Sequence, residues 1–329
     1  MAKAKKLSVY QAHDKFFKLT FADPGVKESF IQTYLPEELA RDIDLSAVEE
    51  VSPTFISESF QLDESDLLIK ARAMGKPIYL LFLMEHKSYK DWKTPLQILR
   101  YFIAIWESQL TKKEKLTPIL PIVIYEGKTK WRYPQISEYF KDLPDHWKAY
   151  LPLYEALFFD FSLESKLNKL PESVELKSYL QVIQTVYLKD KETFLKQLVE
   201  ILYWIDQAGS DDSEAFITIF RRILIYAENT RNDLQEENED LFDLLKGADP
   251  MKKTSIERWE ERIRAEAIDA ARNDILAEGM EKGMEKGRAE GRAEGRAEGQ
   301  ESAVQNIAQK MKSMGFALDD IQKVTGLML

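Results

Sequence analysis

The strongest constraint on the fold is a pair of strand-like runs separated by a single glycine turn. DLLIKAR (66–72) and PIYLLFLM (77–84) are rich in apolar residues, and the second is apolar throughout. A two-residue turn at Gly75-Lys76 would join them, because glycine commonly leads such hairpin turns. Counting outward from that turn brings Asp66 opposite Glu85. The hairpin therefore predicts two carboxylates at one end of a buried sheet.

Two carboxylates in that position need compensation. They repel unless a proton or a cation lies between them, and even a neutral polar group costs roughly 2–7 kcal/mol when it is buried without a partner. A hard divalent cation with oxygen ligands would relieve both problems. Strand alternation places Lys87 on the same face as Asp66 and Glu85, where it would orient a metal-bound water. The alternative is that the carboxylates only flank the strands, with Lys87 as an ion-pair partner.

The neighbouring segments predict the class of fold. Residues 13–35 have a helical pattern broken at Asp23-Pro24-Gly25, and the strand-like run PTFISESF precedes the hairpin. TPLQILRYFIAIWESQL (94–110) has apolar residues at helical spacing. PILPIVIYEG (118–127) is typical of a buried strand. This order indicates an α/β domain over residues 1–150, with a central mixed sheet flanked by helices.

The rest of the chain has a different character. Residues 151–250 contain three amphipathic helical segments and predict an all-α accessory region. Of the net charge of −10, residues 1–150 contribute about +1 and residues 151–329 about −11. A polyanion is therefore expected to meet the first half of the chain.

Residues 251–329 predict a C-terminal helical repeat segment. A helix is expected from Thr254, followed by glycine at every fourth position from 279 to 299 and by a helical hairpin that turns at Gly315. Glycine costs about 1 kcal/mol per helical position, so a flexible linker is one interpretation of the array. The other is a helix whose glycine row lets a second backbone approach, and we expect this segment to form a homo-oligomer, most simply a dimer.

Composition excludes several classes of protein. The chain has no cysteine, which rules out disulfides and thiolate zinc sites. The N-terminus lacks the apolar region of a secretory signal, and no apolar run approaches the ~20 residues of a membrane span. We therefore expect a cytoplasmic protein with no membrane partner.

The hairpin and its surroundings resemble a known family. An Asp, then Glu-x-Lys on the next strand, then a helix, is similar to the PD-(D/E)XK nuclease core, which is restriction-endonuclease-like. More narrowly, the chain resembles the recombination-promoting nucleases, also described as transposases. The matching stretches are HDKFFKLTF, FISESF with SDLLIK, LMEHKSYKDWKTPLQILRY and LPIVIYEG, between residues 13 and 127. Many members carry Gln at the position of Lys87, where this chain has the lysine of the general nuclease pattern.

The resemblance implies cleavage of DNA that depends on Mg²⁺ or Mn²⁺. Asp66 and Glu85 would bind the metal, with the backbone carbonyl of His86 as a third ligand, and Lys87 would position the attacking water. Such an enzyme would act in recombination, transposition or defence against foreign DNA. The alternative function is a catalytically inactive scaffold or protein-interaction module.

Further residues are candidates for accessory roles. Glu64 shares a face with Asp66 and is either an outer ligand or a solvated strand start. Gln97 lies one turn into the following helix and is a candidate for facing the site. His13 and Asp14 open the family motif, and Asp14 is also a candidate helix cap.

A basic group flanks the strand at 118–127 and is interspersed with Trp131 and Tyr133. These residues are expected either to contact a DNA backbone or to form a solvated loop and hairpin. The group consists of Lys112, Lys113, Lys115, Lys128, Lys130 and Arg132.

Overall fold

The computed structural model describes residues 7–51, 66–85, 92–208, 213–234, 240–315 and 317–327. The chain divides into two compact units, Met1–Glu260 and Glu261–Leu329. The expected strand PTFISESF lies outside the described residues. None of the helices in the described ranges combines the length and the apolar character needed to cross a membrane.

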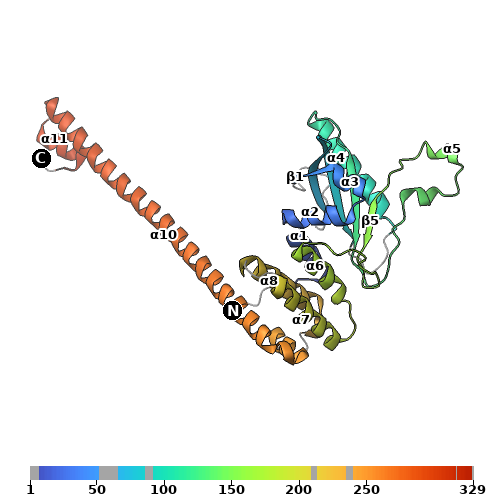
Figure 1. Ribbon diagram of the computed structural model, residues 1–329. Helices are drawn as coiled ribbons and strands as arrows, with labels where there is room; N and C mark the ends of the chain where they lie inside the picture. Colours follow the sequence, from blue (N-terminus) through green and yellow to red (C-terminus); the bar gives the residue numbers. More distant parts are fainter. Residues whose placement is uncertain are drawn as a thin grey trace. The chain divides into compact units, whose positions relative to one another are not determined.

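The first unit begins with two helices whose ends are set by the local sequence (Figure 1). Helix α1 (Val9–Phe21) starts with a capping box formed by Ser8 and Gln11. Helix α2 (Pro24–Tyr34) starts with Asp23 as N-cap and proline in its first turn. The predicted break at Asp23-Pro24-Gly25 is therefore confirmed, and the short helix α3 (Glu37–Asp42) follows.

A five-stranded mixed sheet forms the centre of this unit. Its strands follow the chain in the order β1 (Ile43–Glu50), β2 (Leu67–Ala73), β3 (Lys76–Glu85), β4 (Ile119–Tyr125) and β5 (Leu157–Asp160). β2 is antiparallel to both β1 and β3, whereas β3, β4 and β5 are parallel to one another. The expectation of an α/β fold with a mixed sheet is confirmed.

Helices cover both faces of the sheet. Helix α4 (Thr94–Thr111) connects β3 to β4, as a parallel pair requires a crossover. Its residues Ile98, Tyr101 and Phe102 pack with Leu81 of β3. Phe82, the next residue of β3, contacts Phe21 of α1 and Phe30 of α2, on the opposite face. The sheet therefore separates α4 from α1 and α2.

Two strands of the sheet, β1 and β5, were not predicted from the sequence. β1 carries three acidic residues in its sequence IDLSAVEE and is disturbed by a register shift between Asp44 and Glu49, so it lacks a clear apolar alternation. β5 has only four residues and extends the sheet beyond residue 150. Between β4 and β5 lie the 3₁₀ helix η2 (Ile136–Phe140) and helix α5 (Asp145–Lys148).

The remainder of the first unit is helical, as predicted. Its elements are α6 (Val174–Thr185), α7 (Lys191–Ala208), α8 (Ser213–Thr230), the 3₁₀ helix η3 (Asn232–Leu234), α9 (Leu241–Ala248) and the 3₁₀ helix η4 (Pro250–Lys252). Helix α1 packs on α8 and α6, with the ring of Phe16 against those of Tyr179 and Tyr226. The helical region and the sheet therefore share one core.

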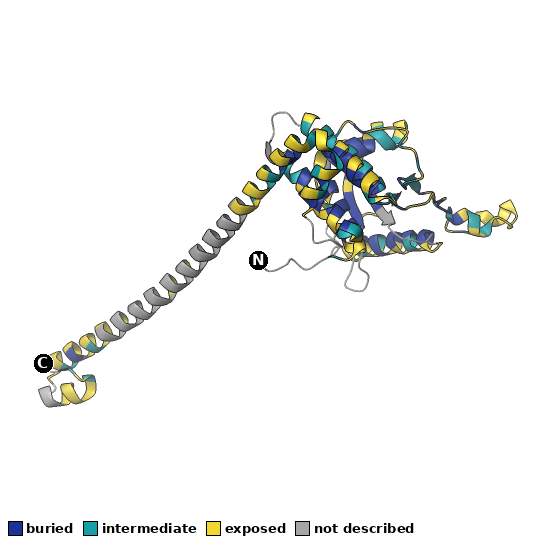
Figure 2. Cartoon of the chain, turned by 90° about the horizontal axis from the view of Figure 1, so that it is seen from below, coloured by how far each residue is buried: buried dark blue, intermediate teal, exposed yellow. Residues whose placement is uncertain are grey.

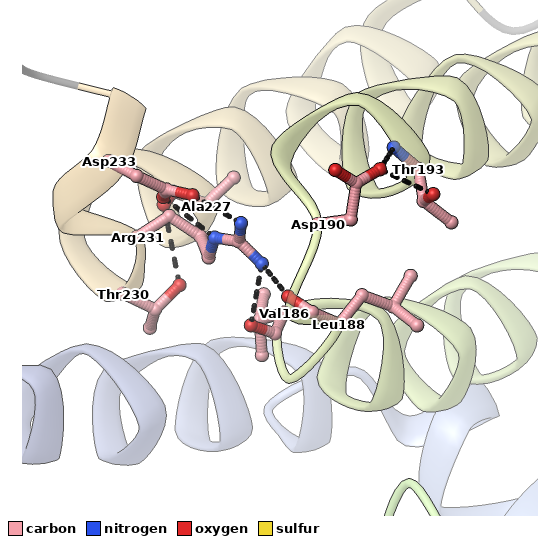
Figure 3. Close-up of polar contacts among 8 residues, drawn as sticks. All are labelled: Val186, Leu188, Asp190, Thr193, Ala227, Thr230, Arg231 and Asp233. Carbon is pink, nitrogen blue, oxygen red and sulfur yellow. Dashed lines mark hydrogen bonds and ion pairs between the residues drawn. The ribbon is translucent and has the colours of Figure 1, made fainter.

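A buried arginine joins the helices of this region (Figure 3). Arg231, just after α8, donates to the backbone carbonyls of Val186 and Leu188, which follow α6. It also forms an ion pair with Asp233, and its guanidinium lies 4.5 Å from the ring of Phe194. One side chain thus satisfies the end of α6 and neutralises a carboxylate.

The second unit is mostly one helix. Helix α10 (Lys253–Ser313) begins in the first unit and runs through the glycine array, so the backbone of the array is helical. Gly315 adopts a φ of 84°, which allows the turn into α11 (Leu318–Thr325). The predicted turn at Gly315 and the second helix after it are confirmed.

Candidate functional site

Acidic residues lie at one end of the strands of the sheet, and we call this end the carboxylate edge. β2 begins there, directly after Asp66, while β3, β4 and β5 end there. The parallel registers align Glu85 with Tyr125 and Tyr125 with Asp160. Acidic positions from distant parts of the sequence therefore lie at the same ends of these strands.

The register between β2 and β3 differs from the sequence prediction. Ala73 pairs with Lys76, so the turn is Met74-Gly75 and not Gly75-Lys76. Met74 and Gly75 have φ values of 50° and 76°, and positive φ at both central positions is the requirement of a type I′ turn. A methionine with positive φ is uncommon. The sequence therefore suggested a turn led by glycine, one residue too late.

This correction moves the two carboxylates relative to each other. Leu67 pairs with Phe82, so Asp66 comes level with Leu83, and the prediction that it lies opposite Glu85 is wrong. Because the register changes by two residues, positions 66 and 85 still share one face of the sheet. They are one diagonal step apart, which corresponds to about 7–8 Å between Cα atoms. That spacing leaves room for a bridging group.

Asp66 is buried and is held by helix α4. The hydroxyl of Tyr101 donates a hydrogen bond to Oδ2 of Asp66. Gln97, one turn earlier, donates from Nε2 to the Tyr101 hydroxyl at 2.9 Å. The two side chains meet because residues four apart share a helix face. Gln97, an accessory candidate from the sequence, thus contacts Asp66 through Tyr101.

Sequence reasoning assigned no role to Tyr101. It lies among apolar residues at helical spacing, which is also the pattern of a core aromatic residue. The available signal was its position four residues after Gln97. A buried tyrosine usually finds a partner for its hydroxyl, and here the partner is Asp66.

Glu85 is the last residue of β3, with its backbone aligned to Tyr125. The other residues predicted for the site, Glu64, His86 and Lys87, lie outside the described residues. Their roles as outer ligand, carbonyl ligand and water-positioning group stay predictions.

His13 and Asp14 lie in the middle of α1, on the face of the sheet opposite α4. Ser8 caps this helix, so the suggestion that Asp14 is a helix cap is wrong. Nδ1 of His13 lies 2.7 Å from the hydroxyl of Tyr226 and 3.8 Å from Oε2 of Glu126. These contacts join α1 to α8 and to the end of β4.

The buried imidazole of His13 is neutral. Desolvation by burial lowers the pKa of His13 to about 3. The hydroxyl of Tyr179 donates to Oε1 of Glu126, and that of Tyr187 donates to the backbone carbonyl of Glu126 at 3.2 Å. Burial first, and then the charge of Glu126, raises the pKa of Tyr226. The hydroxyls therefore act as hydrogen-bond donors in this cluster.

The predicted basic group is divided between the two ends of β4. Lys112, Lys113 and Lys115 are exposed before the strand, at the edge away from Asp66. The other three are exposed after it, near the carboxylate edge: Lys128, Lys130 and Arg132.

The aromatic residues within this second set do not face solvent. Trp131 and Tyr133 are buried in the core that includes Tyr125. The idea that they accompany the basic residues on a nucleic-acid surface is therefore wrong. Arg132 also forms a 2.8 Å ion pair with Glu138.

The donor set at the edge suits a hard cation with few protein ligands. Within the part of the chain that the structure describes, no group of three or more His, Asp or Glu side chains is arranged to hold a metal ion. Mg²⁺ usually binds through one or two carboxylates and keeps several waters. Asp66 supplies one carboxylate of the kind that this mode of binding uses.

Comparisons with known proteins place this arrangement in a family. Residues 11–213, more than half of the chain, match the model of the family described as "Putative transposase, YhgA-like". The recombination-promoting nuclease RpnC of Escherichia coli K12 is 33% identical over 116 residues, which are 35% of this chain and 39% of RpnC. RpnA of the same organism is 28% identical over 116 residues, 35% of this chain and 40% of RpnA.

A third relative carries a different description. The inactive recombination-promoting nuclease-like protein RpnE of E. coli K12 is 25% identical over 134 residues, 40% of this chain and 44% of RpnE. The match thus covers less than half the length of each of these three relatives. No solved structure matches the chain. With the family match over residues 11–213, the chain belongs to the YhgA-like putative transposase family, and over about a third of its length it is similar to the nucleases RpnC and RpnA.

Proposed function

We propose that this chain is a metal-dependent DNA endonuclease that hydrolyses phosphodiester bonds, and that residues 1–150 contain a restriction-endonuclease-like core. The observation that carries the proposal is the buried carboxylate of Asp66 at the sheet edge, one diagonal step from position 85. The order of β2, β3, α4 and β4 supports it, because the carboxylates precede a helix and a parallel strand. The names of RpnC and RpnA support a nuclease acting in recombination.

In this proposal the residues at the carboxylate edge bind the metal and position the attacking water. Asp66 and Glu85 would hold Mg²⁺ or Mn²⁺, with the His86 carbonyl as a further ligand. When bound, the metal would lower the pKa of a coordinated water and neutralise charge on the phosphate. Lys87 would position that water, and Glu64 would be an outer ligand.

Tyr101 would act on Asp66 itself. Its hydroxyl donates to Oδ2 and fixes the orientation of the carboxylate. Gln97 would in turn orient the tyrosine hydroxyl, because its amide donates to that oxygen. Both are positioning residues, since they reach the site through Asp66.

DNA would approach the carboxylate edge of the sheet. Lys128, Lys130 and Arg132 are the basic residues after β4 at this edge, and we assign the backbone contacts to them first. Lys112, Lys113 and Lys115 lie at the opposite end of β4. They would be reached only by a longer duplex.

The C-terminal segment would assemble protomers. Residues 251–329 are not expected to bind DNA, because they carry no net positive charge and the C-terminal half as a whole is acidic. Helix α10 presents glycine at every fourth position, which allows close approach of a second backbone. A dimer would bring two nuclease domains to the two strands of a duplex.

A catalytically idle scaffold is the second candidate. The observation that favours it is the similarity to RpnE, which is named as inactive. A scaffold of this kind would keep the fold and lose the metal. The two candidates therefore differ first in metal binding.

Thermal unfolding with and without Mn²⁺ distinguishes them. A cation that binds only the folded state stabilises it by mass action, by about 2.7 kcal/mol at a hundredfold excess over Kd. We expect the melting temperature to rise with Mn²⁺ in the wild type and in Asp160→Asn, and not in Asp66→Asn. Asp160 is the matched control, because it lies at the same edge with both oxygens bound to backbone amides of Trp131 and Ser162. A wild-type melting temperature that is independent of Mn²⁺ would favour the scaffold.

A further inference from the structure

Two neighbouring segments of the Met1–Glu260 unit expose large apolar side chains. One is α4 with its flanking residues, 92–116. The other is residues 134–155, which carry η2 and α5 and which we call the arm. Figure 1 shows the arm extending away from the sheet, and Figure 2 shows its exposed end. All ten residues from 141 to 150 are exposed.

The outer side of α4 has the pattern of a helix-pairing surface. Leu96, Ile103 and Leu110 follow one another at intervals of seven residues and are 51%, 48% and 61% exposed. Leu99 and Trp106 lie between them and are half-buried. Apolar side chains spaced alternately three and four residues apart form the seam of a helix that packs on another helix.

The arm exposes a comparable set of side chains. Tyr150 is 81% exposed, and tyrosine is a residue enriched at protein interfaces. The exposed large apolar residues of the arm are Tyr139, Leu143, Trp147, Tyr150 and Leu153. The segment therefore presents aromatic side chains without a core of its own.

The two surfaces are continuous. At the base of the arm, the hydroxyl of Tyr139 donates to the carbonyl of Trp92, and that of Tyr154 donates to the carbonyl of Pro95. The ring of Tyr154 also lies 5.1 Å from that of Phe102 of α4. These contacts fix the base of the arm on the first turns of α4.

The combined area is large enough for a stable interface. About ten large apolar side chains, each roughly half exposed, present on the order of 1,000 Å², given about 200 Å² for a large aromatic side chain. A standard interface buries about 800 Å² on each partner. The largest apolar patch of a typical monomer is about 300–600 Å².

The charges indicate what covers this face. Residues 92–116 carry five basic and two acidic side chains, whereas the arm carries four acidic and two basic ones. The arm would therefore be attracted to the α4 segment of another molecule, while its acidity opposes contact with a phosphate backbone. Both complementary surfaces belong to the same chain.

We propose that this face is an interface between two copies of the chain, in which the arm of one protomer lies along α4 of the other. The exchange is reciprocal, so it closes under a twofold axis. It is separate from the assembly expected for residues 251–329, and it does not require that the chain be a nuclease.

Disulfide cross-linking tests the proposal directly, because the natural chain has no cysteine. Full-length Ile103→Cys and Tyr150→Cys proteins are mixed and oxidised, and the covalent heterodimer is measured by mass. The matched control replaces the first protein by Ile225→Cys, since Ile225 is an isoleucine on helix α8 with 42% exposure. The control reports the collisions caused by any other contact between protomers, including one through residues 251–329.

We expect the Ile103 and Tyr150 pair to cross-link at least about tenfold more than the control pair, and the added substitution Leu96→Glu to remove this excess. Equal yields for the two pairs would overturn the proposal. Sedimentation of Ile103→Glu and Ile225→Glu, with and without a DNA duplex, completes the test. If Ile103→Glu weakened DNA binding and left self-association unchanged, the face would bind DNA and the proposal would fall.

Discussion

Lowering the pH should destabilise this protein through the buried imidazole of His13. Burial lowers the pKa of His13 to about 3 in the folded state, from about 6.5 in an unfolded chain. Between these values the unfolded state binds more protons than the folded state. The contribution of neutral His13 to the free energy of unfolding is therefore fully present above pH 6.5 and is lost as the pH falls. Each pH unit in this window costs about 1.36 kcal/mol. At pH 5 the free energy of unfolding should therefore have fallen by roughly 2 kcal/mol on account of His13.

Urea unfolding at several pH values between 7.5 and 5 measures this contribution as the difference between the wild type and His13→Gln. The difference is needed because Glu175 acts in the opposite direction. Desolvation by burial, opposed by the charge of Arg222, raises the pKa of Glu175 to about 7. Its contribution to the free energy of unfolding therefore becomes more favourable as the pH falls. His146→Gln is the matched control, because His146 is exposed. The reasoning is refuted if His13→Gln shows the same pH dependence as the wild type.

Three other substitutions test separate parts of the structure. Tyr101→Phe removes the hydrogen bond to Asp66 and should lower the free energy of unfolding by about 1–3 kcal/mol in urea titrations; an unchanged value would show that the bond does not matter to stability. Arg231→Met leaves two backbone carbonyls and the half-buried carboxylate of Asp233 without their donor and should cost about 1–3 kcal/mol, whereas Arg132→Met, in an exposed ion pair, should cost about 1 kcal/mol or less. Met74→Asn supplies the residue preferred in a type I′ turn and should stabilise the protein by about 0.5 kcal/mol; a loss of stability would contradict the turn assignment.

The parts of the fold that were predicted correctly are those with strong local signals. Asp23 and Pro24 end one helix and begin the next through capping and a missing amide, which are properties of the residues themselves. Strand β4 is apolar throughout because it is buried in a parallel arrangement. Helix α4 was found from its spacing, although Leu96 and Ile103 turned out to face solvent.

The parts that were missed depend on contacts between distant residues. The turn at Met74-Gly75 has no asparagine or aspartate to mark it, so the register was placed two residues away. The hydrogen bond from Tyr101 to Asp66 joins residues 35 positions apart in the sequence. Spacing alone cannot distinguish such a tyrosine from an ordinary core residue, because both lie on the buried side of the helix.

His13 illustrates the same limit. Its place at the start of a family motif made it a candidate for the site, but its neighbours Tyr226 and Glu126 come from α8 and from the end of β4. Helical periodicity can predict that it is buried. It cannot predict which of the two faces of the sheet the helix covers.

Cleavage of a supercoiled plasmid in the presence of Mg²⁺ or Mn²⁺ tests the central claim most directly. We predict that the wild type and Asp160→Asn nick the plasmid, that the Asp66→Asn, Glu85→Gln double variant does not, and that Lys87→Ala is slower by about 10²–10⁴-fold, as expected for loss of a group that handles the proton of the water. Full activity in the Asp66→Asn, Glu85→Gln variant, or the absence of cleavage by the wild type with either metal, would contradict the account.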